Sequence, residues 1–335
     1  MNLLSRALKT ALALVQVFLL GVCVWVSLES RRVASLKPHP VLIEIEKGWG
    51  VRTIAETLKR EGVLTKKTLF VARYRLFFRR AALQAGQYEM AAPSSPQSVL
   101  EALSRGLVYL HSVTVAEGLT AQETFPILEA AGFGTVDRFI KAATDTSALG
   151  ILDPLASDLE GYLFPETYRL PKGISPAGIL SRMVDQFRGV FTDPWRRRAA
   201  ALGFSVRDVV ILASLIEKET GRPEEKSLVS SVFHNRLKAG MKLECDPTII
   251  YALKKAGTYD GKLHGKDLHF ESPYNSYLHP GLPPGPICNP GRASLNAALH
   301  PAETDFFFFV ARHDGSHRFS RTLREHNQAV DEYRR

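Results

Sequence analysis

One uncharged segment near the N-terminus constrains this chain more than any other feature. Thr10 to Leu28 is a run of 19 residues without charge, dominated by Leu, Val, Ala and Phe. As a helix it would measure about 28 Å at about 1.5 Å per residue, close to the roughly 30 Å of a bilayer hydrocarbon core. The segment therefore predicts one transmembrane helix over residues 10–28.

A cleaved signal peptide is the alternative for this segment. The apolar core of a signal peptide is usually only about 7–15 residues long, and a small-residue cleavage site follows it. The sequence from Ser27 to Arg32 is a poor cleavage site, so we favour an uncleaved anchor. Both interpretations export the remainder of the chain. The flanking charges nearly balance and leave the orientation open: Arg6 and Lys9 before the segment, and Glu29, Arg31 and Arg32 after it.

Composition adds broad limits. The chain has 335 residues, of which 45% are hydrophobic and 23% charged, which is typical of two or three folded units. Its net charge of +9 suits an anionic partner such as acidic lipid or a cell-wall polymer, and export argues against nucleic acid. The three cysteines have no CxxC or Cys/His spacing, so no structural zinc site is expected.

A local pattern occurs twice after the apolar segment. An alternating strand at Val41–Ile45 leads through a glycine turn to a helix at residues 51–58, which Gly62 closes, and a second helix follows. The same order recurs 70 positions later, with Val113 and Val115 in the strand and Gly132 closing the helix. Two such copies predict a duplicated small α/β element.

The segment between the copies contains a further predicted helix. Pro93–Pro96 is typical of a loop, and Ser98 is the expected N-cap, with Glu101 as its capping-box partner. Val99, Leu100 and Leu103 give this helix its apolar face.

Two carboxylates end a strongly apolar helix further along. Val206 to Lys218 is apolar nearly all round, with Ser205 as the expected N-cap, so the helix is predicted to be buried. Glu217 and Glu219 lie at its end, two positions apart, and must therefore point to different sides. A carboxyl group against apolar walls has a raised pKa and can act as a general acid near neutral pH.

The segments that follow are rich in Pro, Gly, Tyr and Asn. A helix over residues 226–237 precedes loops containing Asp246–Thr248, Ser272–Tyr277 and Gly281–Ile287. Exposed aromatic rings and amides suit sugar binding, because sugar rings stack on aromatic faces and hydroxyls pair with amides and carboxylates.

A family resemblance rests on an ordered set of these motifs. They are Glu160–Tyr168, Glu217–Thr220, Ser231–Leu237, Gly240-Met241, Asp246–Thr248, Tyr274–Tyr277 and Gly281–Ile287. Together they resemble the YceG-like (MltG) endolytic murein transglycosylases over essentially the whole chain after the apolar segment. The resemblance implies an α+β protein with a single N-terminal transmembrane helix, a small LysM-like α/β module and a mixed α/β catalytic domain with a buried catalytic helix. The corresponding ranges are 1–9 for a cytoplasmic tail, 29–40 for a linker, 41–108 for the module and 109–335 for the catalytic domain.

The resemblance also implies an activity and its residues. Glu219 would be the one catalytic acid–base, with Glu217 as the alternative, and would cleave the bond between N-acetylmuramic acid and N-acetylglucosamine of nascent glycan strands to leave a 1,6-anhydro end. No cofactor or metal is expected. The expected substrate-binding residues are Glu166, Tyr168, Asn235, Asp246, Tyr274, Asn275 and Tyr277. The expected site of action is the outer face of the inner membrane, with termination of strand elongation beside peptidoglycan synthases as the expected role.

Several alternatives remain open on the sequence. The chain could be a non-catalytic wall-binding scaffold, or a hydrolase that recruits Asp246 or Glu166 as a second carboxylate. A zinc enzyme would have to use His264, His269, His279 and His300, although no HExxH spacing supports it. Cys245 and Cys288 stand where the family pattern predicts Thr- or Ser-like residues; they could form a disulfide or remain free thiols, and neither is expected to take part in the chemistry.

Overall fold

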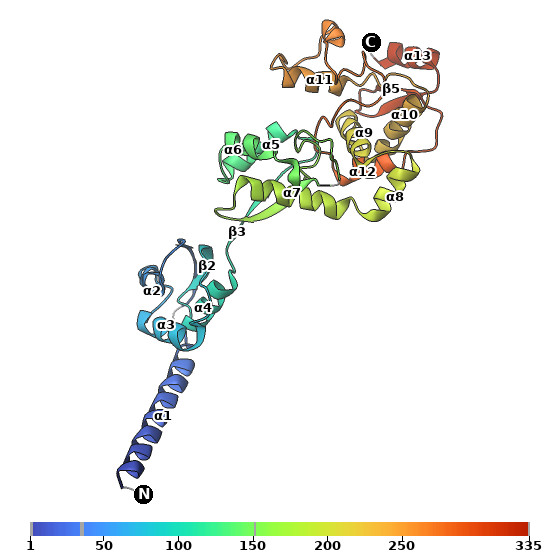
Figure 1. The fold of residues 1–335 in the computed structure, drawn as a ribbon. Helices are drawn as coiled ribbons and strands as arrows, with labels where there is room; N and C mark the ends of the chain where they lie inside the picture. Colours follow the sequence, from blue (N-terminus) through green and yellow to red (C-terminus); the bar gives the residue numbers. More distant parts are fainter. Residues whose placement is uncertain (1–2, 34–36, 151, 334–335) are drawn as a thin grey trace. The chain divides into compact units, whose positions relative to one another are not determined.

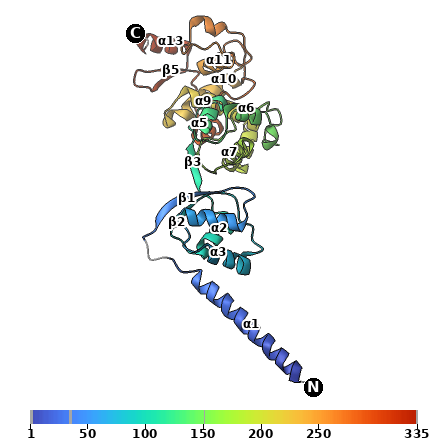
Figure 2. The same ribbon diagram turned by 90° about the vertical axis from the view of Figure 1, so that its left-hand side faces the viewer.

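The computed structural model describes residues 3–33, 37–150 and 152–333 (Figures 1 and 2). Parts of three predicted ranges therefore lie outside the described residues, namely 1–2 of the tail, 34–36 of the linker, and 151 and 334–335 of the catalytic domain. The chain divides into two compact units, one of residues 1–111 with 169–173, and the other of residues 112–168 with 174–335. Within the described residues the strands form three separate two-stranded sheets among many helices, so the fold is α+β as expected.

The predicted apolar helix is present. Helix α1 covers Leu3–Glu29, and the most apolar 18-residue window within Leu8–Glu29 has a mean hydropathy of 2.4. The 22 residues of Leu8–Glu29 extend for about 33 Å. Large apolar side chains such as Leu14, Phe18 and Trp25 are exposed along it. A helix of this length with apolar residues facing outward is compatible with a single-pass membrane anchor.

The first unit is a small α/β layer around one core. Strand β1 (His39–Ile45) pairs antiparallel with β2 (Gly86–Ala92), placing Ile43 opposite Tyr88. Its remaining elements are α2 (Val51–Arg60), α3 (Lys67–Arg73), a π-helical turn at Tyr74–Phe78, and α4 (Pro96–Arg105). Alternate residues of β1 and one face of each helix meet in the core, which includes Ile43, Ile45, Ile54, Leu58, Phe70, Tyr88, Leu100 and Leu103.

The N-cap predicted for α4 is wrong. The helix begins three residues earlier than expected, because the Ser95 side chain accepts a hydrogen bond from the Ser98 backbone N–H and Pro96 occupies the first helical position. Proline suits that position because it has no N–H to leave unpaired. Glu101 does not complete a capping box; its carboxylate accepts a hydrogen bond from Gln97 instead.

The duplicated pattern is confirmed as local structure. The first copy runs β1, α2, Gly62, α3, and the second runs β3 (Leu110–Thr114), α5 (Ala121–Ala130), Gly132, α6 (Val136–Ala143). Gly62 and Gly132 have φ values of 76° and 82°, in the left-handed region that residues with a Cβ rarely adopt. The two strands pair differently, however, because β1 joins β2 whereas β3 joins β4 (Thr167–Pro171).

The second unit is mainly helical, and α9 (Val206–Glu219) lies inside it. Helices α8, α10, α11 and α12 all contact α9, and Figure 1 shows them gathered around it. The remaining described elements are α7 (Pro176–Val190), α8 (Asp193–Ala201), α10 (Lys226–Lys238), α11 (Asp246–Lys255), α12 (Arg292–Leu299), β5 (Phe308–Ala311), β6 (His317–Ser320), α13 (Leu323–Tyr333), and 3-10 turns at Thr146–Ala148, Pro223–Glu225 and Gly265–His269. Strands β5 and β6 pair antiparallel.

Helix α9 has the start and burial that its sequence predicts. Ser205 and Asp208 form a capping box, which satisfies two backbone N–H groups at the start of the helix. Every residue from Val209 to Ile216 is buried. The helix ends at Glu219, one residue later than predicted, because Thr220 is extended, with φ and ψ of −140° and 131°. Glu219 is therefore the last helical residue of a core helix.

Candidate active site

A cavity of about 250 Å³ opens at the end of α9 where Glu219 lies. Its walls come from segments far apart in the sequence: α9, α10, the start of α11, the loop before α12, and the β5–β6 hairpin with α13. The lining residues are Glu219, Arg236, Leu243, Glu244, Asp246, Tyr277, Phe309, Val310, Ala311, His317 and His326. The cavity thus combines carboxylates, a guanidinium, imidazoles and apolar surface.

Glu219 is the carboxyl group most altered by this environment. Burial of its side chain raises its pKa to about 7, a hydrogen bond from Cys245 opposes that rise, and the nearby Asp246 carboxylate adds to it. The positive charge of Arg236 favours the ionised form to a smaller extent. A carboxyl group with this pKa is about half protonated at neutral pH, so it can both donate and accept a proton there.

The start of α11 forms the wall beside Glu219. Cys245 precedes the helix; its backbone N–H donates to the Ser276 hydroxyl at 2.9 Å, and its carbonyl accepts from the Thr248 hydroxyl at 2.7 Å. The Tyr277 hydroxyl donates to the Asp246 carboxylate at 2.6 Å. Two predicted site residues, Asp246 and Tyr277, therefore lie with Glu219 in one cavity.

Arg236 also lines the cavity, a position that no local sequence pattern predicts. Its Nε donates to the carbonyl of Phe307 at 2.7 Å, and its Nη1 donates to the carbonyl of Leu243 at 3.1 Å and the carboxylate of Glu244 at 3.0 Å. These bonds tie α10 to the loop before α11 and to the segment entering β5. Arg236 was passed over because it lies off the apolar face of α10, although a buried arginine in a motif of the resembled family was a usable signal.

The C-terminal hairpin was also missed. Phe309 and His317 come from β5 and β6 and line the cavity, and the His317 ring is hydrogen-bonded to Glu225 at 2.7 Å. Their positions, nearly a hundred residues after Glu219, gave no local pattern that connects them with α9.

Glu217 has a different environment from Glu219, as the two-residue spacing predicts. Its carboxylate accepts from the Lys226 ammonium at 2.9 Å and from the Gly291 backbone N–H at 2.9 Å. The side chains of Glu217 and Lys226 are only 8% and 6% exposed, so both charges of this pair are withdrawn from water. Glu217 is thus held in an ion pair that joins α9, α10 and the start of α12, and it does not line the cavity.

Three residues expected to bind substrate donate hydrogen bonds to backbone carbonyls. The Asn235 amide donates to the carbonyls of Thr304 and Phe306, and the buried Asn275 amide donates to the carbonyls of Leu268 and Phe270. The Tyr168 hydroxyl is buried and donates to the Phe164 carbonyl. These hydrogen bonds hold the backbone of the loops in place.

Two further expected residues lie outside the Glu219 cavity. Glu166 is exposed, and its carboxylate accepts from the Thr167 N–H at 2.9 Å. Tyr274 packs its ring 4.9 Å from that of Tyr251 on α11, and it lines another depression together with Glu160. Neither residue is therefore brought to Glu219.

The cysteines and histidines have contacts that bear on the disulfide and zinc alternatives. Cys245 and Cys288 are free thiols and form no disulfide. The Cys245 thiol is hydrogen-bonded to Glu219, whereas the Cys288 thiol donates a hydrogen bond to the Ser214 carbonyl at 3.4 Å. Cys245 thus lies against Glu219, although neither cysteine is expected to take part in the chemistry. Within residues 3–33, 37–150 and 152–333, no group of three or more His, Cys, Asp or Glu side chains is arranged to hold a metal ion. His264, part of the zinc alternative, pairs with Asp260.

Comparison with known proteins gives consistent matches. A model of the YceG-like family matches residues 43–332. An endolytic murein transglycosylase of Bacillus subtilis (strain 168) is 33% identical over 310 residues, which cover 88% of this chain and 84% of that protein. An endolytic murein transglycosylase of Streptococcus pneumoniae serotype 2 is 26% identical, and the match covers 88% of this chain but only 58% of the pneumococcal protein.

A solved structure matches as well. The crystal structure of a yceG-like protein from Listeria monocytogenes superposes with a TM-score of 0.59 at 29% sequence identity. The match covers 88% of this chain and 100% of the Listeria chain.

Proposed function

Because this chain belongs to the YceG-like family, we propose that it is an endolytic peptidoglycan transglycosylase, a lyase, in which Glu219 is the single acid–base group. The observation that carries the proposal is the position of Glu219, whose carboxyl group ends a core helix at a cavity wall and has its pKa raised to about 7. The names of the relatives support the substrate, because both are murein transglycosylases.

The first step is protonation of the leaving group. Protonated Glu219 donates its proton to the glycosidic oxygen between N-acetylmuramic acid and N-acetylglucosamine. The C1–O bond breaks, its electron pair stays with the departing 4-hydroxyl of N-acetylglucosamine, and an oxocarbenium-like centre forms at C1 of the muramoyl sugar.

The second step returns Glu219 to its protonated form. Its carboxylate, now ionised, removes the proton from the C6 hydroxyl of the muramoyl residue, and that oxygen closes on C1 to form the 1,6-anhydro ring. One C–O bond breaks and one forms, the proton returns to Glu219, and no water is consumed. One group suffices because a pKa near 7 makes both proton transfers accessible at neutral pH.

Other cavity residues would stabilise the positive charge of the transition state and keep the cavity wall in position. The Asp246 carboxylate, fixed by the Tyr277 hydroxyl, would stabilise positive charge developing at C1. Arg236, fixed by three backbone carbonyls and Glu244, would keep the wall rigid. We assign Asp246 and Tyr277 to substrate binding, and Tyr168, Asn235 and Asn275 to support of the loops.

A hydrolase is the second candidate, because Asp246 places another carboxylate in the same cavity. Such an enzyme would deliver water to C1 and leave a reducing end. Mass spectrometry of products from purified glycan strands distinguishes the two reactions. We expect internal cuts whose muramoyl ends are lighter by one water than reducing ends; reducing ends alone would replace the transglycosylase with a hydrolase, and uncut strands would favour a binding scaffold.

The other parts of the chain fit an enzyme working at a membrane. We infer that α1 anchors the protein in the inner membrane with the N-terminus in the cytoplasm and the second unit outside it, and that residues 41–108 form a LysM-like module beside a catalytic domain at 109–335. The 22-residue apolar span and the compact α/β core of the first unit support this arrangement. Peptidoglycan synthases are the proposed partners, since cleavage beside the membrane would end the strands that they elongate. Protease protection of either terminus in sealed vesicles tests the orientation.

A further inference from the structure

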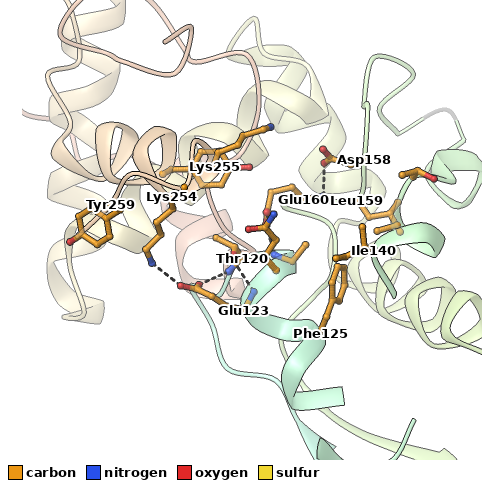
Figure 3. Close-up of a pocket in the computed structure, with 16 residues that line it drawn as sticks. Thr120, Glu123, Phe125, Ile140, Asp158, Leu159, Glu160, Lys254, Lys255 and Tyr259 are labelled. Atoms are coloured by element: carbon orange, nitrogen blue, oxygen red, sulfur yellow. Dashed lines mark hydrogen bonds and ion pairs between the residues drawn. The ribbon is translucent and has the colours of Figure 1, made fainter. Parts of the chain in front are cut away.

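A second cavity of about 490 Å³ lies within the catalytic unit, apart from the Glu219 cavity (Figure 3). It is bounded by the start of α5, by α6, by the turn at Asp158–Glu160, and by the second half of α11 with the loop after it. No lining residue is shared with the Glu219 cavity. The cavity therefore has no role in the proton transfers proposed above.

One side of this cavity is apolar. Phe125, Ile140, Ala143 and Leu159 form it, and Figure 3 shows Phe125 and Ile140 lying together across from Lys254 and Tyr259. The Ile140 side chain is 46% exposed, although it lies in a folded helix. An aliphatic wall of this kind suits methyl groups better than the hydroxyl-rich faces of a sugar.

Glu160 lies between the two sides and is only 8% exposed. Its carboxyl oxygens accept from the Ala121 backbone N–H at 3.0 and 3.2 Å. Burial raises its pKa to about 8, so at neutral pH it is mostly uncharged. A protonated Glu160 offers both a donor and an acceptor, which matches an amide group.

The other side carries two cations in different situations. Lys254 forms an ion pair with Glu123 at 2.7 Å. The Lys255 ammonium lies over the rings of Tyr274 and Tyr251, 5.2 Å and 5.8 Å from their centroids, and it pairs with no carboxylate among the described residues. Lys255 is exposed and therefore available to an incoming carboxylate.

Helix α11 contributes residues to the walls of both cavities. Its first residue, Asp246, lines the Glu219 cavity, whereas Lys255, its last, lines the second cavity. These nine steps of helix correspond to about 13 Å along the axis. A group bound at Lys255 would therefore lie well away from the sugar bond being cut.

We propose that this second cavity binds the peptide that a muramoyl residue carries, with alanyl methyl groups against Ile140, amides at Glu160 and a peptide carboxylate at Lys255. This inference rests on the proposed function, because it requires peptidoglycan as the substrate. Binding energy from a remote substituent helps to position the bond that reacts. The subsite makes the enzyme faster on strands that carry peptides.

The test compares two substrates with the full-length protein in detergent. Initial rates are measured on peptide-bearing glycan strands and on strands freed of peptide by an amidase. Lys255→Glu repels the carboxylate, and Ile140→Trp fills the cavity; we expect each to lower the ratio of kcat/KM for peptide-bearing over peptide-free strands at least tenfold. The matched controls Lys262→Glu and Leu155→Trp change exposed residues outside the cavity and should keep the wild-type ratio.

The outcomes separate this inference from the proposed function. A wild-type ratio near one, or an unchanged ratio in both variants, overturns the peptide subsite while cleavage itself stands. Equal losses on both substrates would assign the cavity to the sugar chain and also overturn it. If wild-type protein cuts neither substrate, the proposed function fails first. Titration of the free peptide into the Glu219→Gln protein measures binding without catalysis. An affinity for the peptide that stays unchanged when Lys255→Glu is added to this protein would contradict the inference.

Discussion

The Cys245 thiol donates a hydrogen bond to the carboxylate of Glu219. Cys245 is buried, and burial together with the Glu219 charge raises its pKa well above the usual value, so it remains a protonated donor. The Ser276 hydroxyl and the first turn of α11 fix its backbone. A small donor at position 245 therefore holds Glu219 in place and limits the rise of its pKa.

Removing this donor should move the pH dependence of the enzyme. A hydrogen bond is worth about 0.5–1.5 kcal/mol, which corresponds to roughly half to one pKa unit. Cys245→Ala should therefore raise the pKa of Glu219 and shift the alkaline limb of kcat/KM upward by about that amount, whereas Cys245→Ser keeps a donor and should stay near the wild-type position. If the alkaline limb of kcat/KM falls at the same pH in wild type, Cys245→Ala and Cys245→Ser, the Cys245 hydrogen bond has no influence on the pKa of Glu219.

The pH profile of the wild-type enzyme follows from the pKa of Glu219, which is about 7. The acid form starts the reaction, so kcat/KM should be level below about pH 7 and fall about tenfold per unit above it. Glu160, with a pKa of about 8, is a second titrating group, and a Glu160→Gln control should leave the limb near 7. A rate that stays level to pH 9 would contradict a protonated Glu219.

The buried Glu217–Lys226 pair should matter for stability. Glu217→Gln leaves the Lys226 ammonium buried without its counter-charge, which costs about 3–5 kcal/mol, while the double variant Glu217→Gln/Lys226→Met should recover most of the loss. Denaturant unfolding measures both. A folded Glu217→Gln protein that is as inactive as Glu219→Gln would transfer the acid role to Glu217.

Glu219 should make the fold less stable at alkaline pH. Its pKa is raised from 4.5 to about 7, so the proton that it binds more tightly in the folded state stabilises the fold below about pH 4.5. This stabilisation disappears as the pH rises through 7, a difference on the order of 3 kcal/mol. Glu219→Gln does not titrate, so its melting temperature relative to wild type should rise between pH 5 and pH 8.5. A constant difference would mean that Glu219 is not buried in an apolar environment.

Local pattern was enough to predict the elements around the site. Ser205 and Asp208 form a capping box that starts α9, and Gly221 and Pro223 follow its end, so the bounds were correct to one residue. The spacing of Glu217 and Glu219 placed them on different sides because helical geometry leaves no other choice. The α4 cap failed because Ser95 and Ser98 are both suitable residues, and only Pro96 distinguishes them.

The walls of the site depend on contacts that no local pattern encodes. Asn235 and Asn275 resemble ligand-binding amides, yet they donate hydrogen bonds to partly buried backbone carbonyls of loops near residues 270 and 305. Tyr274 and Tyr277 lie on the same short loop but face different cavities, because the loop is irregular and has no period. Phe309 and His317 reach the cavity only through the pairing of β5 with β6.

The most direct test of the central claim is digestion of purified glycan strands by Glu219→Gln, with Glu271→Gln as the matched control because Glu271 is an exposed glutamate outside the Glu219 cavity. Glutamine keeps the size of the side chain but cannot exchange a proton, so we expect the release of 1,6-anhydro ends to fall about a thousandfold, within the roughly 10²–10⁴ range for general acid–base catalysis. The control should cut like wild type. Anhydro ends formed by folded Glu219→Gln at the wild-type rate would contradict the account.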